Sequence, residues 1–69
     1  MSPAAALLVI EERIRNATGA ILSARRSEAR GDLRDMSAFA SAASDYLLEA
    51  AELISALCES VDNSAPSGG

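Results

Sequence analysis

Few side chains in this sequence are of the types that carry out chemistry. The chain has 69 residues, with one cysteine, no histidine and six basic residues, all of them arginine. Two acidic pairs stand close together in the sequence: Glu11 with Glu12, and Glu49 with Glu52. Zinc sites and general acid/base sites commonly use histidine, and acidic pairs without one are normally solvated. The sequence therefore predicts no catalytic residue, no metal site and no cofactor, and hence a protein that is not an enzyme.

The single cysteine and the arginines are the remaining polar candidates. Cys58 has no histidine or lysine to activate its thiol, so we expect it to be a buried or half-buried apolar filler. Four arginines cluster near the middle of the chain: Arg25, Arg26, Arg30 and Arg34. Three acids are interleaved with these four arginines, which leaves +1 on this arginine patch, and the whole chain carries a formal charge of −4. Because neutralisation of phosphates drives nucleic-acid binding, this charge disfavours a nucleic-acid partner.

The two aromatic residues belong to one ridge that could bind a protein. Phe39, Tyr46 and Leu53 follow one another at intervals of seven, which places them on one line along a helix. Aromatic residues beside an arginine are typical of protein-binding hot spots. We therefore predict this aromatic ridge as the anchor for a partner, with Arg13 as a neighbouring contact. Packing of the same ridge against a second copy of the chain is the alternative.

Two helices must position these residues. Ser2 followed by Pro3 is typical of a helix start, with serine as the N-cap and proline in the first turn. Gly31 can adopt the positive φ that ends a helix, and Asp32 directly after it can cap the next one. We predict helices over 3–30 and 33–62, a turn at 31–32 and a flexible tail over 63–69. The predicted fold is all-α, an antiparallel two-helix hairpin over 3–62.

Apolar residues form one stripe along each predicted helix, at alternating intervals of 3 and 4. In the first helix they are Leu7, Ile10, Ile14, Ala17, Ile21 and Ala24. In the second they are Leu33, Met36, Ala40, Ala43, Leu47, Ala50, Ile54, Leu57 and Val61. We expect the two stripes to face each other with large residues against small ones, so that Ile21 meets Ala40 and Ala43. This register also brings Arg13 and Arg15 near Glu49 and Glu52, and Gly19 is expected to mark a close approach of the helices.

The length and composition predict that one hairpin alone cannot build a sufficient hydrophobic core. Hydrophobic residues make up 49% of the chain but aromatic ones only 3%, so the core of a single hairpin is thin. Apolar residues also remain on both flanks of the stripes, and we expect a homodimer that forms a four-helix bundle. A lone cysteine, no signal-peptide pattern and no membrane-length apolar run predict a cytoplasmic protein.

The capped hairpin with its turn at Arg30-Gly31-Asp32 resembles two kinds of small helical protein. Its architecture is similar to Rop, a hairpin that dimerises into a four-helix bundle and binds paired RNA loops. Its length, its hairpin over 3–62 and its use of alanine and arginine resemble the small phage-encoded anti-quorum-sensing proteins. The second resemblance implies a helical dimer that binds and inactivates a LuxR-type transcriptional activator of the bacterial host, with a pilus-assembly ATPase as a second target.

Three functions are therefore expected from the sequence. The leading one is a protein-binding inhibitor, or anti-activator, that uses the aromatic ridge and Arg13. The second is a Rop-like RNA-binding regulator that uses the arginine patch, although the chain is acidic and has no lysine. The third is a structural or secretion-chaperone hairpin.

Overall fold

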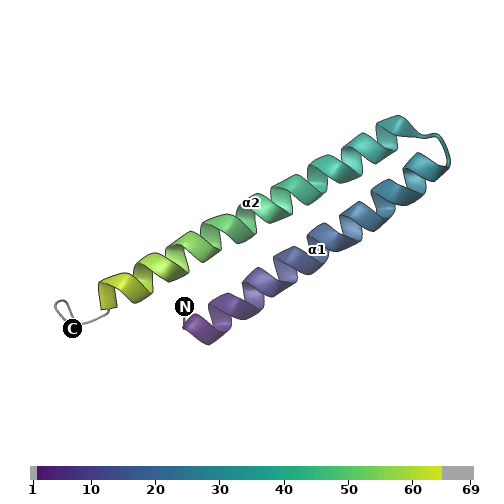
Figure 1. Ribbon diagram of the computed structural model, residues 1–69. Helices are drawn as coiled ribbons and strands as arrows, with labels where there is room; N and C mark the ends of the chain where they lie inside the picture. The colour runs from purple at the N-terminus through teal and green to yellow at the C-terminus, as the bar shows by residue number, and fades with distance from the viewer. Residues whose placement is uncertain (1, 65–69) are drawn as a thin grey trace.

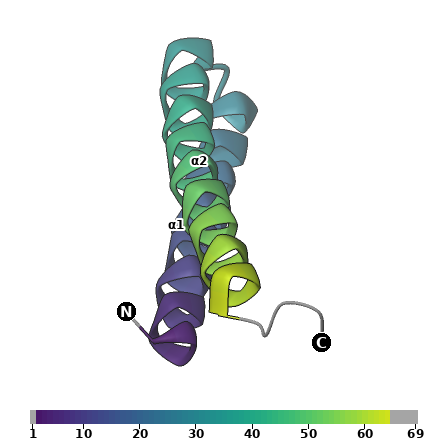
Figure 2. The same cartoon turned by 90° about the vertical axis from the view of Figure 1, so that its left-hand side faces the viewer.

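The structure, a computed structural model that describes residues 2–64, is a helical hairpin. Helix α1 spans Pro3–Ala29 and helix α2 spans Leu33–Ser64, with no strand in residues 2–64. The two helices run antiparallel along their whole length and cross at a shallow angle (Figures 1 and 2). The result is a rod of 57 × 16 × 15 Å. The turn lies at one end of the rod, here called the turn end, and the start of α1 and the end of α2 lie at the other, the open end (Figure 1). The predicted all-α hairpin is confirmed.

Local capping sets where α1 begins. The Ala5 backbone N–H donates to Ser2 Oγ over 3.1 Å, and Pro3 occupies the first turn. The serine hydroxyl thereby satisfies one of the backbone donors that the first turn of a helix leaves free. Proline at this position loses nothing, because its missing N–H has no partner within the helix. These two residues explain the helix start that the sequence predicts.

The turn is a Schellman motif closed by glycine. Arg30 is the C-cap of α1, and Gly31 follows with φ +78°. The Gly31 N–H donates to the Glu28 carbonyl and the Asp32 N–H to the Ser27 carbonyl, both over 2.9 Å. Asp32 then caps α2, since its Oδ1 accepts the Asp35 backbone N–H over 3.0 Å. The chain therefore reverses direction within three residues.

The observed helix bounds differ from the predicted ones by one or two residues. Helix α1 ends at Ala29, one residue before the predicted end, because Arg30 is the cap. Helix α2 continues to Ser64, so residues 63 and 64, predicted in the tail, are helical. Asp62 and Asn63 have a low helix propensity, which weakens a helix but does not end it. The remaining part of the predicted tail, 65–69, lies outside the described residues.

The contact between the helices, here called the seam, is built from small residues. Its fully buried members are Ala6, Ile10, Ala17, Ala24 and Ser27 of α1, with Ala43 and Ala50 of α2. Ala17 and Ala43 are only 3% and 2% exposed. Small side chains let two helices approach closely, since side-chain size sets the distance between their axes. The seam therefore packs small residues against small ones.

The predicted packing of large residues against small ones does not form the seam, although Ile21 and Ala40 lie side by side as expected. Ile14, Ile21 and Leu47, each predicted to lie inside the hairpin, are 43–50% exposed. Each apolar stripe consists of two rows at intervals of seven, and a single partner helix can cover only one of them fully. The row with most of the alanines gives the closer approach and faces the seam. The row of larger residues is turned outward beside it.

Gly19 does not mark a close approach of the helices, contrary to the sequence-based expectation. It is exposed, and a Cβ added to it would meet no atom within 4 Å. The residue faces away from α2, so its lack of a side chain serves no contact between the described residues.

Candidate interaction surface

One side of the hairpin carries two adjoining rows of apolar residues that face outward, here called the open face. The rows are Leu7, Ile14 and Ile21 of α1, and Leu33, Ala40, Leu47, Ile54 and Val61 of α2. Intervals of seven keep each row on one line of its helix. The two rows lie on the same side of the seam, because Ile21 and Ala40 line one hollow together. The seven larger side chains are each 43–62% exposed.

The open face has a hollow near the turn end. It has a volume of about 270 Å³, and its lining combines the apolar residues Ile21, Ala24, Met36 and Ala40 with Arg25 and Glu28. Position 40 holds alanine where the other members of its row are leucine, isoleucine or valine. The hollow thus lies where the row is interrupted by a small side chain. The face is therefore raised near the open end and recessed near the turn end.

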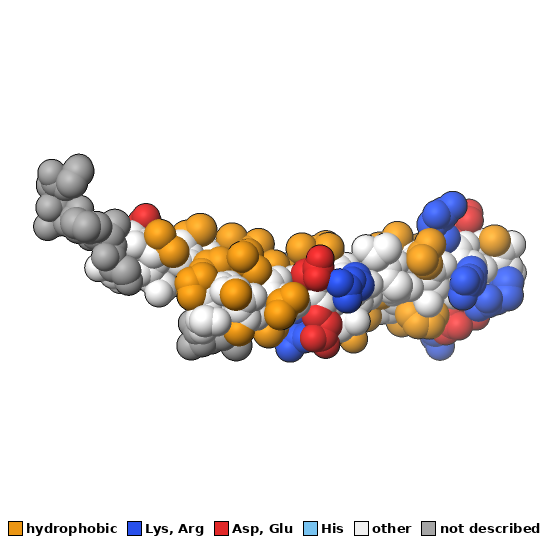
Figure 3. Space-filling model, turned by 90° about the horizontal axis from the view of Figure 1, so that it is seen from below, with side chains coloured by type: hydrophobic (Ala, Val, Ile, Leu, Met, Phe, Trp, Pro, Cys, Tyr) orange, Lys and Arg blue, Asp and Glu red, His pale blue; other side chains and the backbone are white. Residues whose placement is uncertain are grey.

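The charged residues gather toward the two ends of the rod and leave the middle of the open face apolar. None of the eight residues that define the face is charged. Most arginine side chains in view gather at the turn end, while hydrophobic side chains cover much of the half nearer the open end (Figure 3). Among the described residues of the last α2 turns, Glu59 and Asp62 are acidic and none is basic. The turn end is thus rich in arginine, whereas the open end is acidic.

The residues predicted to bind a partner lie on the other side of the seam. Tyr46 and Leu53 are half-buried beside it, and Phe39 is 38% exposed. The Arg13 Nε donates to Glu49 Oε2 over 2.7 Å, which joins the two helices. The structure thus gives Arg13 an intramolecular partner and buries part of the aromatic ridge. Their role in binding another protein stays a prediction.

The predicted ion pairs are found in part. Arg13 pairs with Glu49 across the hairpin as expected. Arg15, expected near the same two acids of the second helix, instead pairs with Glu11 on its own helix over 2.7 Å. That pair spans one helical turn, where opposite charges are neighbours. The Arg13 pair confirms the predicted register along the helix axis, although the helices are rotated relative to the predicted packing.

The polar candidates for chemistry remain separate from one another. Cys58 is exposed, so the predicted buried filler is wrong. The part of the chain that the structure describes contains no cluster of side chains able to hold a metal ion. Within the same residues, no helix combines the length and apolar character needed to cross a membrane. Cys58 therefore has no cluster of potential metal ligands around it.

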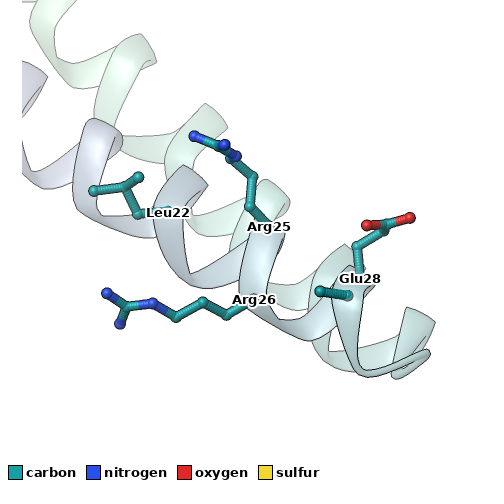
Figure 4. A pocket seen from close by; sticks show the side chains of 5 residues that line it. Leu22, Arg25, Arg26 and Glu28 are labelled. Atoms are coloured by element: carbon teal, nitrogen blue, oxygen red, sulfur yellow. The ribbon is translucent and has the colours of Figure 1, made fainter.

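The arginine patch contains one shallow hollow. Leu22, Arg25, Arg26 and Glu28 line a shallow hollow on α1, and their side chains point in different directions (Figure 4). Arg30 lies 3.9 Å from Asp35, measured between Nη2 and Oδ2. Acidic neighbours therefore offset part of the positive charge, as the sequence suggests. The guanidinium groups of Arg25 and Arg26 do not converge on one point (Figure 4).

No known protein family, curated protein or solved structure matches this chain. No functional residue is therefore transferred to it from a relative. The resemblances to Rop and to the anti-quorum-sensing proteins stay predictions. The open face is therefore identified from the exposure and spacing of its own residues alone.

Sequence reasoning assigned the open face to the inside of the hairpin and so missed it as a surface. A signal was present in the size of the residues. In α1, the row through Ile10 continues with Ala17 and Ala24, whereas the row through Leu7 continues with Ile14 and Ile21. Small residues favour the closest contact between helices. Sorting each stripe by side-chain size identifies the outward row.

Proposed function

We propose that this chain is a non-enzymatic protein-interaction module whose open face pairs with a second copy to form a four-helix bundle. The observation that supports it is the open face, with seven large apolar side chains each about half exposed. Contiguous apolar patches of this kind on small proteins usually mark interaction sites. A symmetric dimer would cover both copies of the face with one contact.

The core of one hairpin also argues for a partner. Among the described residues, the buried hydrophobic side chains are five alanines and Ile10. The accessible surface of the chain is 5079 Å², whereas a compact monomer of this mass exposes about 4,100 Å². The radius of gyration is 16.5 Å, against about 11 Å for a compact domain of this length. A chain with so little core gains much of its stability by association.

Side-chain burial distinguishes the open face from the aromatic ridge as the dimer contact. Complete burial of a Leu, Ile or Val side chain contributes about 1.5–3 kcal/mol, so a half-exposed one has roughly 1 kcal/mol left to gain. Two open faces together offer roughly 14 kcal/mol, and two aromatic ridges roughly 6 kcal/mol. Association costs on the order of 4–15 kcal/mol. The open face offsets nearly the whole of that range, whereas the aromatic ridge offsets only its low end, so the open face is the stronger candidate for the dimer contact.

In this proposal the dimer acts by occupying the surface of another protein in the cytoplasm. The aromatic ridge and Arg13 lie opposite the open face and stay on the outside of the bundle, where they are available to a foreign partner. From the resemblance to anti-quorum-sensing proteins, we propose a LuxR-type activator of the host as that partner. Shared length and hairpin shape support it. A pilus-assembly ATPase is proposed as a second target on the same grounds.

The dimer is tested with a pair of neighbouring leucines. Leu47 lies on the open face and Leu48 on the outward side of α2, and they are 50% and 60% exposed. We expect the parent protein to sediment as a dimer at about 10 µM, Leu48→Glu to remain a dimer, and Leu47→Glu to dissociate or unfold. A folded parent monomer at that concentration contradicts the proposal. So does a dimer that survives Leu47→Glu.

The foreign partner is tested by competition for DNA. A purified LuxR-type activator bound to its promoter DNA is titrated with the protein, and release of the activator is measured. We expect Phe39→Ala or Tyr46→Ala to weaken the effect by about 2 kcal/mol, or roughly thirtyfold, with dimer mass unchanged and Glu52→Gln without effect. No release by the parent contradicts this partner. Retention of the protein on RNA at about 150 mM salt would favour the RNA-binding alternative.

A further inference from the structure

We propose that the two copies pair antiparallel, with the turn end of one hairpin beside the open end of the other. The inference rests on the proposed dimer and specifies how its two open faces meet. The two-fold axis passes at the level of Ile14 and Leu47, perpendicular to the rod. Helix α1 then packs on α1 of the second copy, and α2 on α2.

The middle of the open face defines this level. Ile14 is the middle member of its row in α1, and Leu47 is the middle member of the row in α2. The ion pair between Arg13 and Glu49 places residues 13 and 49 side by side across the hairpin, so Ile14 and Leu47 stand at nearly the same height. An axis there gives the longest overlap of the two apolar faces in an antiparallel pair.

Side-chain volume along the face favours the antiparallel arrangement. The hollow at Ile21 and Ala40 then lies opposite the level of Leu7 and Ile54 in the second copy, where both rows carry large side chains. In a parallel pair the two hollows, each of about 270 Å³, would face each other. Protein interiors are close-packed and contain few voids larger than a water molecule. The antiparallel pair distributes volume evenly along the bundle, whereas the parallel pair leaves a gap near the turn end.

Charge points to the same arrangement. The turn end carries the arginine patch, and the open end carries Glu59 and Asp62. An antiparallel pair sets each arginine patch beside the acidic end of the other copy, whereas a parallel pair sets patch beside patch. Complementary charge selects orientation in an interface more than it adds affinity.

Glu28 adds a like-charge repulsion that disfavours the parallel pair. It follows Ile21 by seven residues and so continues the α1 row of the open face toward the turn. A parallel pair would bring the two Glu28 carboxylates to the same level of the bundle. Like charges in one interface oppose association. In the antiparallel pair the two residues lie about 42 Å apart along the axis.

One row of α2 supplies three probes for the test. Ser37, Ser44 and Cys58 lie at intervals of seven or fourteen residues beside the open face, and all three are exposed. A spin label on native Cys58, or on Ser37→Cys or Ser44→Cys made in a Cys58→Ser background, reports the distance between the two copies by dipolar EPR spectroscopy. At 1.5 Å per residue, the antiparallel pair separates the labels along the axis by about 33 Å at 58, 9 Å at 44 and 30 Å at 37.

The expected result is this pattern of long, short and long distances in a sample whose mass is that of a dimer. Three similar short distances in a dimer would overturn the antiparallel arrangement and leave the proposed dimer intact. A pattern with its minimum at 58 or at 37 would overturn it as well. A monomer without coupling at position 44 would overturn the proposed dimer and this inference together. Unlabelled Cys58→Ser serves as the control for the mass and the helical content.

Discussion

At the scale of single residues, Gly31 is where the chain needs a conformation that other residues resist. Its φ of +78° allows the two bonds to the Glu28 and Ser27 carbonyls. We expect Gly31→Val to lower the free energy of unfolding by about 2 kcal/mol, because a left-handed backbone costs an L-residue about 1–2 kcal/mol and a β-branched one more. Gly31→Asn should lose less, since asparagine tolerates this region. Urea unfolding followed by circular dichroism at one protein concentration measures both, and equal stability of Val and parent contradicts the turn geometry.

Gly19 gives the opposite prediction at the same scale. It lies inside α1, is exposed and has open space where a Cβ would project. We expect Gly19→Ala to raise the free energy of unfolding by about 1 kcal/mol, because glycine in a helix loses more backbone entropy than alanine. Thermal unfolding of the variant and the parent at matched concentration measures it. A lower melting temperature for the variant would show that a contact outside one hairpin uses this glycine.

At the scale of the elements, the seam depends on residues small enough for a close approach. Ala43 is 2% exposed and lies in the middle of α2. We expect Ala43→Leu to destabilise the protein by about 1–3 kcal/mol, because a larger side chain must push the helices apart. The control is Ala38→Leu, an exposed position of the same helix, where a change within about 0.5 kcal/mol is expected. Chemical unfolding measures both, and equal effects would show that position 43 is not in the seam.

At the scale of the whole molecule, stability should depend on protein concentration. If the open face is covered by a second copy, each tenfold rise in concentration adds about 1.4 kcal/mol to the stability of the dimer and raises Tm by about 3–6 °C. Differential scanning calorimetry over a hundredfold range of concentration measures this slope. A Tm that stays constant over the range indicates a hairpin that is stable alone.

The two helices, their starts and the turn could be predicted from the sequence because short-range chemistry determines them. Ser2 and Asp32 each supply an oxygen to a backbone N–H three residues later, and Gly31 supplies the positive φ. Each of these contacts spans at most five residues. The charge match of Arg13 with Glu49 likewise predicted the register along the axis. These features need no knowledge of how the helices are rotated.

Only the tertiary structure decided which side of each helix faces the other. Both stripes combine a smaller row and a larger row that lie only about 50° apart around the helix, so the sequence pattern is compatible with either row in the seam. The structure places Ala17 and Ala43 inside and leaves Ile14 and Leu47 outside. Close approach of two helices favours small residues between them. This rotation turned predicted core residues into the open face and set part of the predicted binding ridge beside the seam.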